Sequence, residues 1–201
     1  MKTKQNTRRL VILAMLSGIM LVMSYTPLGY LNIGPLAISL NMIPVAIGAV
    51  VLGPAGGAFL GAVFGVTSCL QCVGIGGTSA MGVALFEISP LLTIAQRFVT
   101  RVLAGWLTGV IYRWLKRRQF RCCAYAAGFS AALLNTVFFM TALVVLFGQT
   151  DYLRNLIDGR NILIFVLSFV GINAAVELLS TTVIVGAVSK ALEKLKVIGG
   201  K

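Results

Sequence analysis

Residues 10–86 read LVILAMLSGIMLVMSYTPLGYLNIGPLAISLNMIPVAIGAVVLGPAGGAFLGAVFGVTSCLQCVGIGGTSAMGVALF and contain no Asp, Glu, Lys or Arg. A water-soluble domain needs a charged exterior and cannot leave so long a stretch without it. A lipid bilayer supplies an apolar solvent for such a stretch, provided that the backbone polar groups are paired inside helices. The run therefore predicts several membrane crossings.

The composition of the whole chain agrees with a membrane protein. Of the 201 residues, 58% are hydrophobic and 11% are charged, and the mean hydropathy is +0.96. This is the length of one domain, so we expect a single integral membrane domain over residues 1–201 and no separate soluble catalytic domain. The net charge of +12 would suggest a nucleic-acid partner in a soluble protein. Here the basic residues form short clusters beside apolar segments, which indicates membrane topology instead.

The apolar segments predict an all-α protein with six transmembrane helices, each of which needs about 20 apolar residues. The predicted spans are residues 10–26, 36–53, 55–73, 88–115, 122–148 and 161–190. The second and third are slightly short and are separated by a tight turn at Gly53-Pro54. A basic N-terminus precedes the first span, but no convincing cleavage site follows it, so we expect an uncleaved first helix rather than a signal peptide.

Basic residues are distributed very unevenly between the two sides that six spans define. The side that holds both termini carries Lys2, Lys4, Arg8, Arg9, Arg113, Lys116, Arg117, Arg118, Arg121, Lys190, Lys194, Lys196 and Lys201. The opposite side carries only Arg154 and Arg160. Because positive charge accumulates on the cytoplasmic side, both termini are expected to be cytoplasmic. The outer connections, about 27–35, 74–87 and 149–160, are either lids over a site or ordinary exposed linkers.

Small residues recur at helical spacing in two spans. Gly57, Gly61 and Gly65 lie on one face of the third span, which predicts close packing against a neighbouring helix. Ala14 and Gly18 form a similar pair in the first span. This pair could serve internal packing or dock a partner helix, and its spacing alone favours internal packing.

Charged residues inside the predicted spans are the main functional candidates. Arg97 and Arg101 are four residues apart and share one face of the fourth span. An arginine keeps its proton, so in hydrocarbon it needs a counter-charge, water or a ligand anion. Glu177 lies midway along the sixth span, and an Arg101–Glu177 salt bridge that merely ties two helices together is one interpretation.

The other interpretation is a polar pocket near the outer face, and the two are compatible. In this pocket an arginine binds a carboxylate, while amides bind hydroxyl or amide groups. The amide candidates come from four different spans. The predicted substrate-binding residues are Arg101, Asn135, Asn173, Asn41, Glu177, Arg97 and Gln71.

Several other kinds of chemistry are not expected. The chain has no histidine and only five acidic residues, none at a spacing useful for metal binding, so we predict neither a metal nor a cofactor. Cys69 and Cys72 form a CxxC motif, but they lie in an apolar helix and are expected to be small buried side chains. Phosphotransfer and protease motifs are absent, so we predict no catalytic residues and no enzyme activity.

Several stretches together resemble the substrate-binding S components of energy-coupling factor (ECF) vitamin transporters. They are LNMIPVAIGA at 40–49, LGP at 52–54, GAFLG at 57–61, RVLAG at 101–105, LNT at 134–136 and NAAVE at 173–177. The resemblance covers much of the chain. Its most specific part is the Leu-Gly-Pro turn followed by a glycine-rich third helix.

The resemblance implies a bacterial plasma-membrane protein that binds a vitamin at the outer face, under the first and third loops. It implies no ATPase activity of the chain's own. The expected partners are a transmembrane coupling protein and two cytoplasmic ATPases, on which the S component topples to deliver its ligand. The resemblance also favours docking on a partner helix over internal packing as the role of Ala14 and Gly18. The match is partial, because the family pattern has alanine at both positions.

The stretch from Ile33 to Leu60 and the Arg101 region resemble the pantothenate branch of this family most. Pantothenate carries a carboxylate, an amide and two hydroxyls. Arg101 is expected to pair with the carboxylate, and Asn41, Asn135 and Asn173 to bind the other groups. Riboflavin, folate, biotin or a pyridoxine-like compound is the alternative ligand. A structural subunit that binds no small molecule, or a channel or carrier that works alone, is the alternative function.

Overall fold

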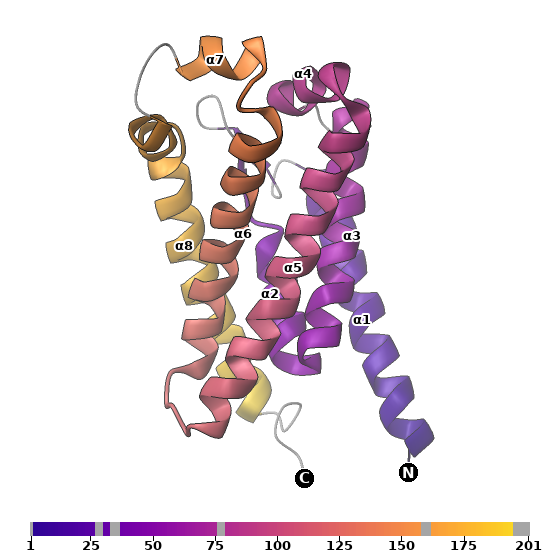
Figure 1. Ribbon diagram of the computed structural model, residues 1–201. Helices are drawn as coiled ribbons and strands as arrows, with labels where there is room; N and C mark the ends of the chain where they lie inside the picture. The colour runs from indigo at the N-terminus through magenta and orange to yellow at the C-terminus, as the bar shows by residue number, and fades with distance from the viewer. Residues whose placement is uncertain (1, 27–29, 33–36, 76–78, 158–161, 195–201) are drawn as a thin grey trace.

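The computed structural model describes residues 2–26, 30–32, 37–75, 79–157 and 162–194, which form a bundle of helices with a small two-stranded sheet. The first residues of α1 and the last residues of α8 lie at the same end of the bundle (Figure 1). The elements are α1 (Lys2–Ser24), β1 (Tyr30–Asn32), β2 (Ala37–Ser39), α2 (Met42–Leu52), α3 (Pro54–Cys72), α4 (Ala80–Ile88), α5 (Pro90–Arg117), α6 (Cys123–Phe147), α7 (Asp151–Ile157) and α8 (Ile162–Lys194).

The structure confirms a predominantly helical membrane architecture but does not confirm the six predicted crossings. Within the described residues, four segments are long and apolar enough to cross a bilayer: Asn6–Ser24, Pro54–Cys72, Cys123–Phe147 and Asn173–Lys194. Helix α5 has 28 residues but carries the two buried arginines. Helix α2 has 11 residues and is about 16 Å long at 1.5 Å per residue. The number of crossings therefore stays a prediction.

The predicted second span, 36–53, is wrong in its first part. Residues 37–39 form β2, which pairs antiparallel with β1 so that Tyr30 lies opposite Ser39. The helix begins only at Met42. A short apolar run fits a strand as well as a helix, and hydrophobicity alone does not separate the two.

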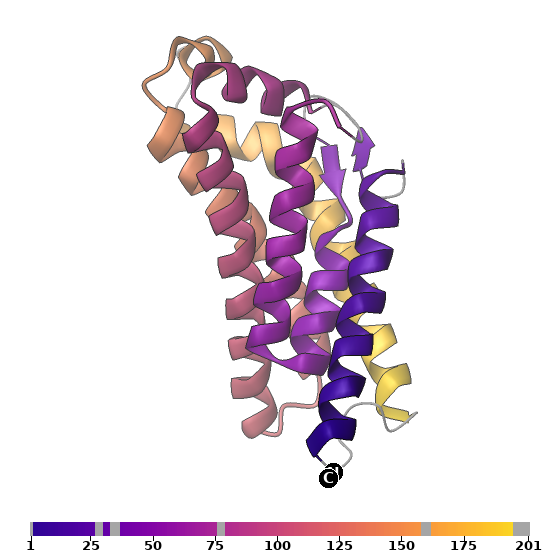
Figure 2. The same cartoon turned by 90° about the vertical axis from the view of Figure 1, so that its right-hand side faces the viewer.

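The second and third outer connections contain helices where the sequence predicted loops. Helices α4 and α7 lie at the end of the bundle opposite the termini (Figure 2). Ser79 caps α4 by accepting a hydrogen bond from the backbone N–H of Gly82 at 3.2 Å. Met81 and Leu85 of α4 join an apolar cluster with Met140, Leu143, Phe147 and Leu153. Parts of the three predicted connections, 27–29, 33–36, 76–78 and 158–161, lie outside the described residues.

Helices α3 and α5 run antiparallel in close contact, and glycines make this contact possible. Gly57 lies against the backbone of Gly105, Gly61 against that of Arg101 and Gly65 against that of Phe98. The predicted internal packing of this glycine stripe is confirmed. Because Gly61 touches the Arg101 backbone, the stripe also sets how α3 lies against both arginines.

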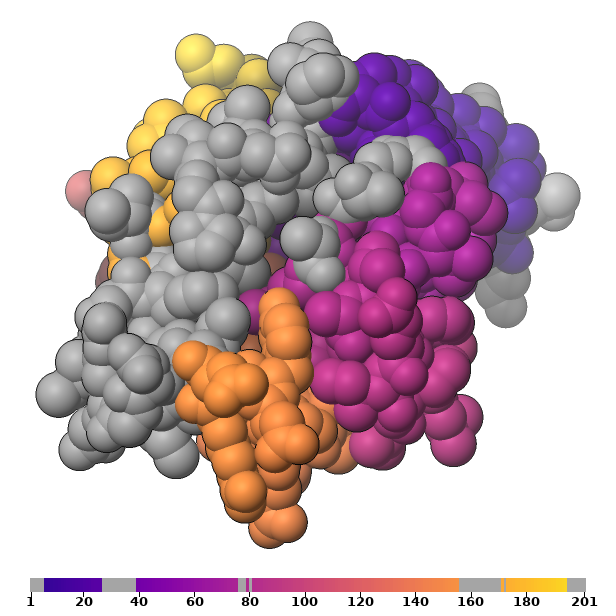
Figure 3. Space-filling model, turned by 90° about the horizontal axis from the view of Figure 1, so that it is seen from above, coloured from indigo at the N-terminus to yellow at the C-terminus, as the bar shows by residue number. Residues whose placement is uncertain are grey.

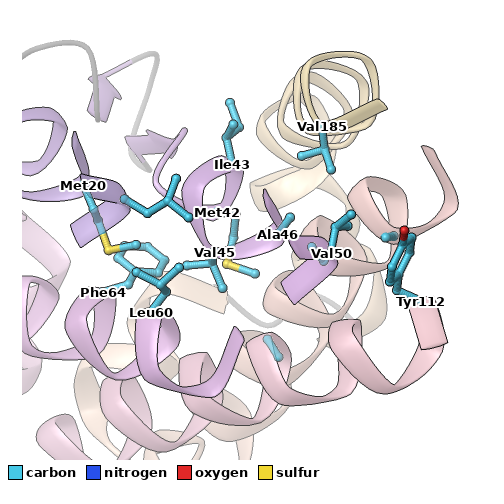
Figure 4. Packing of buried hydrophobic residues seen from close by; sticks show 14 residues of the cluster. Met20, Met42, Ile43, Val45, Ala46, Val50, Leu60, Phe64, Tyr112 and Val185 are labelled. Atoms are coloured by element: carbon cyan, nitrogen blue, oxygen red, sulfur yellow. The ribbon is translucent and has the colours of Figure 1, made fainter. Parts of the chain in front are cut away.

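The interior of the bundle around Phe64 is apolar. Met20 of α1, Met42 and Val45 of α2, and Leu60 and Phe64 of α3 are fully buried and pack together (Figure 4). Large side chains that fill an interior in this way hold each other in place. The ring of Phe64 is therefore held in a fixed position by its neighbours.

Ala14 and Gly18 are exposed on α1, and internal packing, which their spacing alone favoured, is wrong for this pair. A Cβ at Gly18 would have no neighbour within 4 Å. Helix α1 packs on α2 and α3 through its other side, where Leu16 and Met20 are buried. The small-residue pair therefore leaves an open strip on the outside of the bundle.

Candidate functional site

The two predicted intramembrane arginines are buried side by side on α5. Arg97 is 4% exposed and Arg101 is 6% exposed. Cζ of Arg101 lies 4.4 Å from the centroid of the Phe64 ring and 5.7 Å from that of Phe139. A guanidinium at such distances is attracted by the negative faces of the rings. Two aromatic side chains from α3 and α6 thus hold the Arg101 cation inside the bundle.

Arg97 makes polar contacts to two other segments. Its Nη1 donates to Oγ of Ser68 at 2.9 Å and its Nη2 donates to Oγ of Ser79 at 3.3 Å. Its Cζ lies 6.0 Å from the Phe139 ring centroid, so both arginines face the same phenylalanine. Nη1 of Arg101 donates to the backbone carbonyl of Arg97 at 2.9 Å. The predicted shared face of the two arginines is confirmed.

Gln96 fastens α5 to α6 at the same level. Its Nε2 donates to the backbone carbonyl of Phe139 at 3.5 Å. Its Oε1 and the Nε of Arg97 are buried and find no hydrogen-bond partner among the described residues. A buried polar atom without a partner costs about 1–3 kcal/mol, so such atoms tend to mark a place where a ligand or water completes the network.

Asn135 and Glu177 form the polar contact between α6 and α8. Nδ2 of Asn135 donates to Oε1 of Glu177 at 3.2 Å, and both side chains are buried. This bond leaves Oδ1 of Asn135 buried without a partner in the described part of the chain. Arg101 is close enough to interact electrostatically with the Glu177 carboxylate. Asn173 is buried one helical turn before Glu177.

Asn41 and Gln71 meet at a residue that the sequence analysis did not single out, Ser24 at the end of α1. Nδ2 of Asn41 donates to the Ser24 hydroxyl at 3.1 Å, and Nε2 of Gln71 donates to the Ser24 backbone carbonyl at 3.4 Å. Gln71 follows Ser68 by three residues on α3. The predicted site residues therefore fall into two polar groups, one around the arginines and one around Ser24, which α3 connects.

The structure adds four residues to the arginine group: Phe64, Ser68, Ser79 and Phe139. Phe64 and Ser68 are four residues apart, so α3 presents them on one face to Arg101 and Arg97 in antiparallel order. That spacing could have been read from the sequence, but it does not reveal which helix the pair faces. Ser79 was expected in the outer connection 74–87, as part of a loop that could fold back over a site, but its contact with Arg97 was not predicted.

Cys69 and Cys72 of the CxxC motif differ in how deeply they are buried. Cys72 is a free thiol that is 3% exposed, and its Sγ contacts the backbone carbonyl of Ser68 at 3.4 Å. Cys69 is a free thiol that is only half-buried. The predicted burial is confirmed for Cys72. No cluster of three or more His, Cys, Asp or Glu side chains suited to a metal occurs in the described ranges.

A separate open groove of about 540 Å³ lies at the end of the bundle opposite the termini. It is lined by Ala84, Glu87 and Ile88 at the end of α4 and by residues 149–152 at the start of α7. Figure 3 shows α4 and α7 side by side at this end. The groove contains none of the buried arginines or amides, so it is distinct from the arginine group.

The end that holds the termini is strongly basic. Arg113, Lys116, Arg117, Arg118 and Arg121 surround the turn between α5 and α6. Arg118 lies over the Trp114 ring at 5.6 Å and Lys190 over the Tyr125 ring at 4.9 Å. Aromatic and basic residues of this kind are typical of the interface between hydrocarbon and water.

Comparisons with known proteins cover nearly the whole chain. Residues 8–189 match the family described as "ECF transporter, substrate-specific component". The chain is similar to the pantothenate transporter PanT of Leuconostoc mesenteroides, with 28% identity over 94% of both chains. It is also similar to the pantothenic acid transporter PanT of Lactococcus lactis subsp. cremoris, with 30% identity over 94% of this chain and 97% of the relative.

Proposed function

This chain belongs to the substrate-specific components of ECF transporters, and from that premise we propose that it captures pantothenate for an ATP-driven importer. Both relatives described above are named as transporters of this vitamin and align with nearly the whole chain. The family consists of transport components, so the proposed role is ligand capture and delivery without catalysis.

The observation that carries the proposal is the Arg101 cation buried between two aromatic rings. A permanent positive charge in an apolar bundle favours an anionic ligand, and guanidinium matches a carboxylate in geometry. We assign the ligand carboxylate to Arg101. Phe64 and Phe139 exclude water around the pair, which strengthens the attraction between the charges.

The buried amides of Asn135 and Asn173 suit the other groups of pantothenate. Oδ1 of Asn135 is a buried acceptor that can receive a hydroxyl or amide hydrogen of the ligand. Glu177 holds the Asn135 amide through Nδ2 and so points Oδ1 away from itself. Asn173, one turn before Glu177, is the second amide in this assignment. Asn41 and Gln71, which belong to the polar group around Ser24, remain predicted ligand contacts.

The proposed location is a bacterial plasma membrane, with several crossings and both termini in the cytoplasm. The basic end of the bundle, which holds the termini, supports this orientation. The opposite end, with α4, α7 and the two strands, then faces the exterior, from which the vitamin arrives.

The proposed partners are a transmembrane coupling protein and two cytoplasmic ATPases. The open strip at Ala14 and Gly18 on α1 supports docking on the coupling protein, because small residues allow another helix to approach closely. Delivery would follow the family mode, in which the whole component topples in the membrane and carries its ligand to the cytoplasmic side.

Calorimetry with two ligands tests the carboxylate assignment. Panthenol has a primary alcohol in place of the carboxylate of pantothenate and otherwise the same groups. We expect the wild-type protein to prefer pantothenate by at least ~10-fold, as removal of a charge-assisted pair predicts. In Arg101→Ala this preference should disappear, whereas Arg101→Lys should keep part of it. A preference that survives in Arg101→Ala would remove the assigned role.

Two further measurements decide between the proposed function and its alternatives. A ligand that binds the native state raises its thermal stability, so a screen of pantothenate, riboflavin, folate, biotin and pyridoxine identifies the substrate or shows that none binds. A structural subunit would respond to none of them. Vesicle uptake with and without the ATPase module then separates an S component, which needs the module, from an autonomous carrier.

A further inference from the structure

Arg97 differs from Arg101 in what it contacts. Arg101 lies between two aromatic rings of the bundle, whereas both Nη atoms of Arg97 donate to serine hydroxyls, one on α3 and one at the start of α4. The Ser79 hydroxyl that Arg97 contacts also caps α4 by accepting from Gly82 N–H. The Arg97 guanidinium therefore connects the beginning of α4 to the bundle.

The first turn of α4 rests directly on this guanidinium. A Cβ at Gly82 would lie 2.6 Å from Nη2 of Arg97 and 3.1 Å from Sγ of Cys72, so the absence of a side chain at Gly82 lets the helix lie directly against both residues. The turn thereby covers both Arg97 and Cys72, which are 4% and 3% exposed. Contact of this kind is lost as soon as the start of α4 moves outward.

The other end of α4 is attached differently. Ser89, the one residue between α4 and α5, has an extended backbone, with φ −157° and ψ 101°. Thr93 donates from Oγ1 to the backbone carbonyl of Leu85 at 2.8 Å and so holds the end of α4 against α5. Met81 in the first turn of α4 and Leu85 further along it also pack into the apolar cluster with α6 and α7. Thr93 of α5 thus bonds Leu85 and Ser89 at the end of α4, and Arg97 of α5 bonds Ser79 at its beginning.

We propose that Arg97 is a positioning residue that latches the first turn of α4 over the buried site, and that release of this latch about Ser89 controls ligand access. The identity of the ligand that the latch encloses rests on the proposed function, whereas the contacts between Arg97 and α4 do not. The sequence alone predicted that Arg97 binds the ligand. The proposal gives Arg97 a positioning role instead. Opening requires the Arg97–Ser79 hydrogen bond to break and Met81 to leave its apolar contacts, while the end of α4 stays bonded to Thr93.

Cys72 reports the position of α4 without any ligand. Two full-length proteins are compared in the same detergent, each with a single cysteine: one retains Cys72 and the other retains Cys123 at the basic end of α6, with the remaining cysteines replaced by serine. The rate of modification by a water-soluble maleimide is measured for wild-type Arg97, Arg97→Ala and Arg97→Lys.

We expect Arg97→Ala to raise the rate at Cys72 by at least ~10-fold and to leave the rate at Cys123 unchanged, because the hydrogen bonds that are lost are those to Ser68 and Ser79, next to Cys72. Arg97→Lys should give a smaller rise, since its compact cation can reach one hydroxyl at a time. Where Arg97→Ala does not accumulate, Arg97→Lys carries the test. An unchanged Cys72 rate, or equal rises at Cys72 and Cys123 in both variants, would overturn the proposal.

Binding kinetics with radiolabelled pantothenate separate a latch from a ligand contact. A latch variant should speed association and dissociation together, by ~10-fold each, and leave Kd within ~3-fold. Loss of a ligand contact changes mainly the dissociation rate. If the Cys72 rate rises but pantothenate does not bind, the latch stands and the proposed substrate fails. If pantothenate binds and only its dissociation changes in Arg97→Ala, the latch is refuted and the proposed function stands.

Discussion

Gly57 of α3 and Gly105 of α5 pack backbone against backbone, and a Cβ on either residue would overlap the carbonyl of the other. The same face of α3 carries Gly61 against the Arg101 backbone, then Phe64 one turn further along and Ser68 two turns further along. The distance between these two helices therefore sets the geometry of the arginine group.

Replacement of Gly57 by alanine should push α3 away from α5. We expect the free energy of unfolding to fall by about 1–3 kcal/mol, as overpacking of a close contact predicts. Pantothenate affinity should fall as well, because Phe64 and Ser68 move relative to Arg101 and Arg97. Thermal unfolding in detergent and calorimetry measure the two effects. Gly18→Ala, which adds a methyl group where no atom lies within 4 Å, is the matched control: it should leave the affinity unchanged and should not lower the free energy of unfolding, since alanine favours a helix by up to about 1 kcal/mol over glycine.

The Asn135–Glu177 bond predicts different results for two substitutions at Glu177. If the carboxylate acts mainly by holding the Asn135 amide, Glu177→Gln keeps an acceptor in place and should retain affinity for pantothenate within ~3-fold. Glu177→Ala removes the acceptor and should weaken binding by ~10-fold or more. Calorimetry on the purified variants measures both. Equal losses in the two variants would instead assign the effect to the negative charge.

A bulky residue at Gly18 should block docking and leave ligand capture intact. In Gly18→Leu we expect vesicle uptake with the ATPase module to fall by at least ~10-fold, because the added side chain separates the two helices. Pantothenate binding to the isolated protein should not change.

Gly171→Leu is the matched control for docking, since Gly171 is also exposed and has no atom within 4 Å of its Cβ position. Uptake in this control should match the wild type. A comparable loss in both variants would count against the α1 strip and point to a general effect of bulk on the outside of the bundle.

The proposed orientation predicts which cysteines can be labelled from outside an intact cell. Cys122 is exposed at the basic end and should react only with a reagent that crosses the membrane. Asp151→Cys, at the start of α7 on the opposite end, should react with an impermeant maleimide in a protein without other cysteines. Mass spectrometry of the purified protein reads out both. Labelling of Cys122 by the impermeant reagent would reverse the assigned topology.

Some features of the site follow from local spacing and were therefore predictable. Arg97 and Arg101, Asn173 and Glu177, and the glycines of α3 recur at three or four residues, and an α-helix brings such residues to one face whatever surrounds it. The absence of charged residues over 10–86 likewise indicates that this part of the chain lies in lipid rather than in water. These inferences need only the geometry of a single helix.

Other features depended on elements far apart in the chain. Residues 37–39 form a strand because β1 is available to pair with them. The segment around Ser79 became the start of a helix because Met81 and Leu85 find an apolar cluster on α6 and α7. The open strip at Ala14 and Gly18 has the same spacing as the packed glycines of α3, and only the position of the neighbouring helices distinguishes the two.

The sequence by itself determined that this is a helical membrane protein with cations on one face of an apolar helix. Only the tertiary structure decided that Arg101 lies between Phe64 and Phe139 while Arg97, one turn away, reaches Ser68 and Ser79. The physical reason is that helical periodicity fixes which side chains share a face. Which residues of the neighbouring helices contact that face depends on the packing of the whole bundle. Here Gly57, Gly61 and Gly65 set how α3 lies against α5.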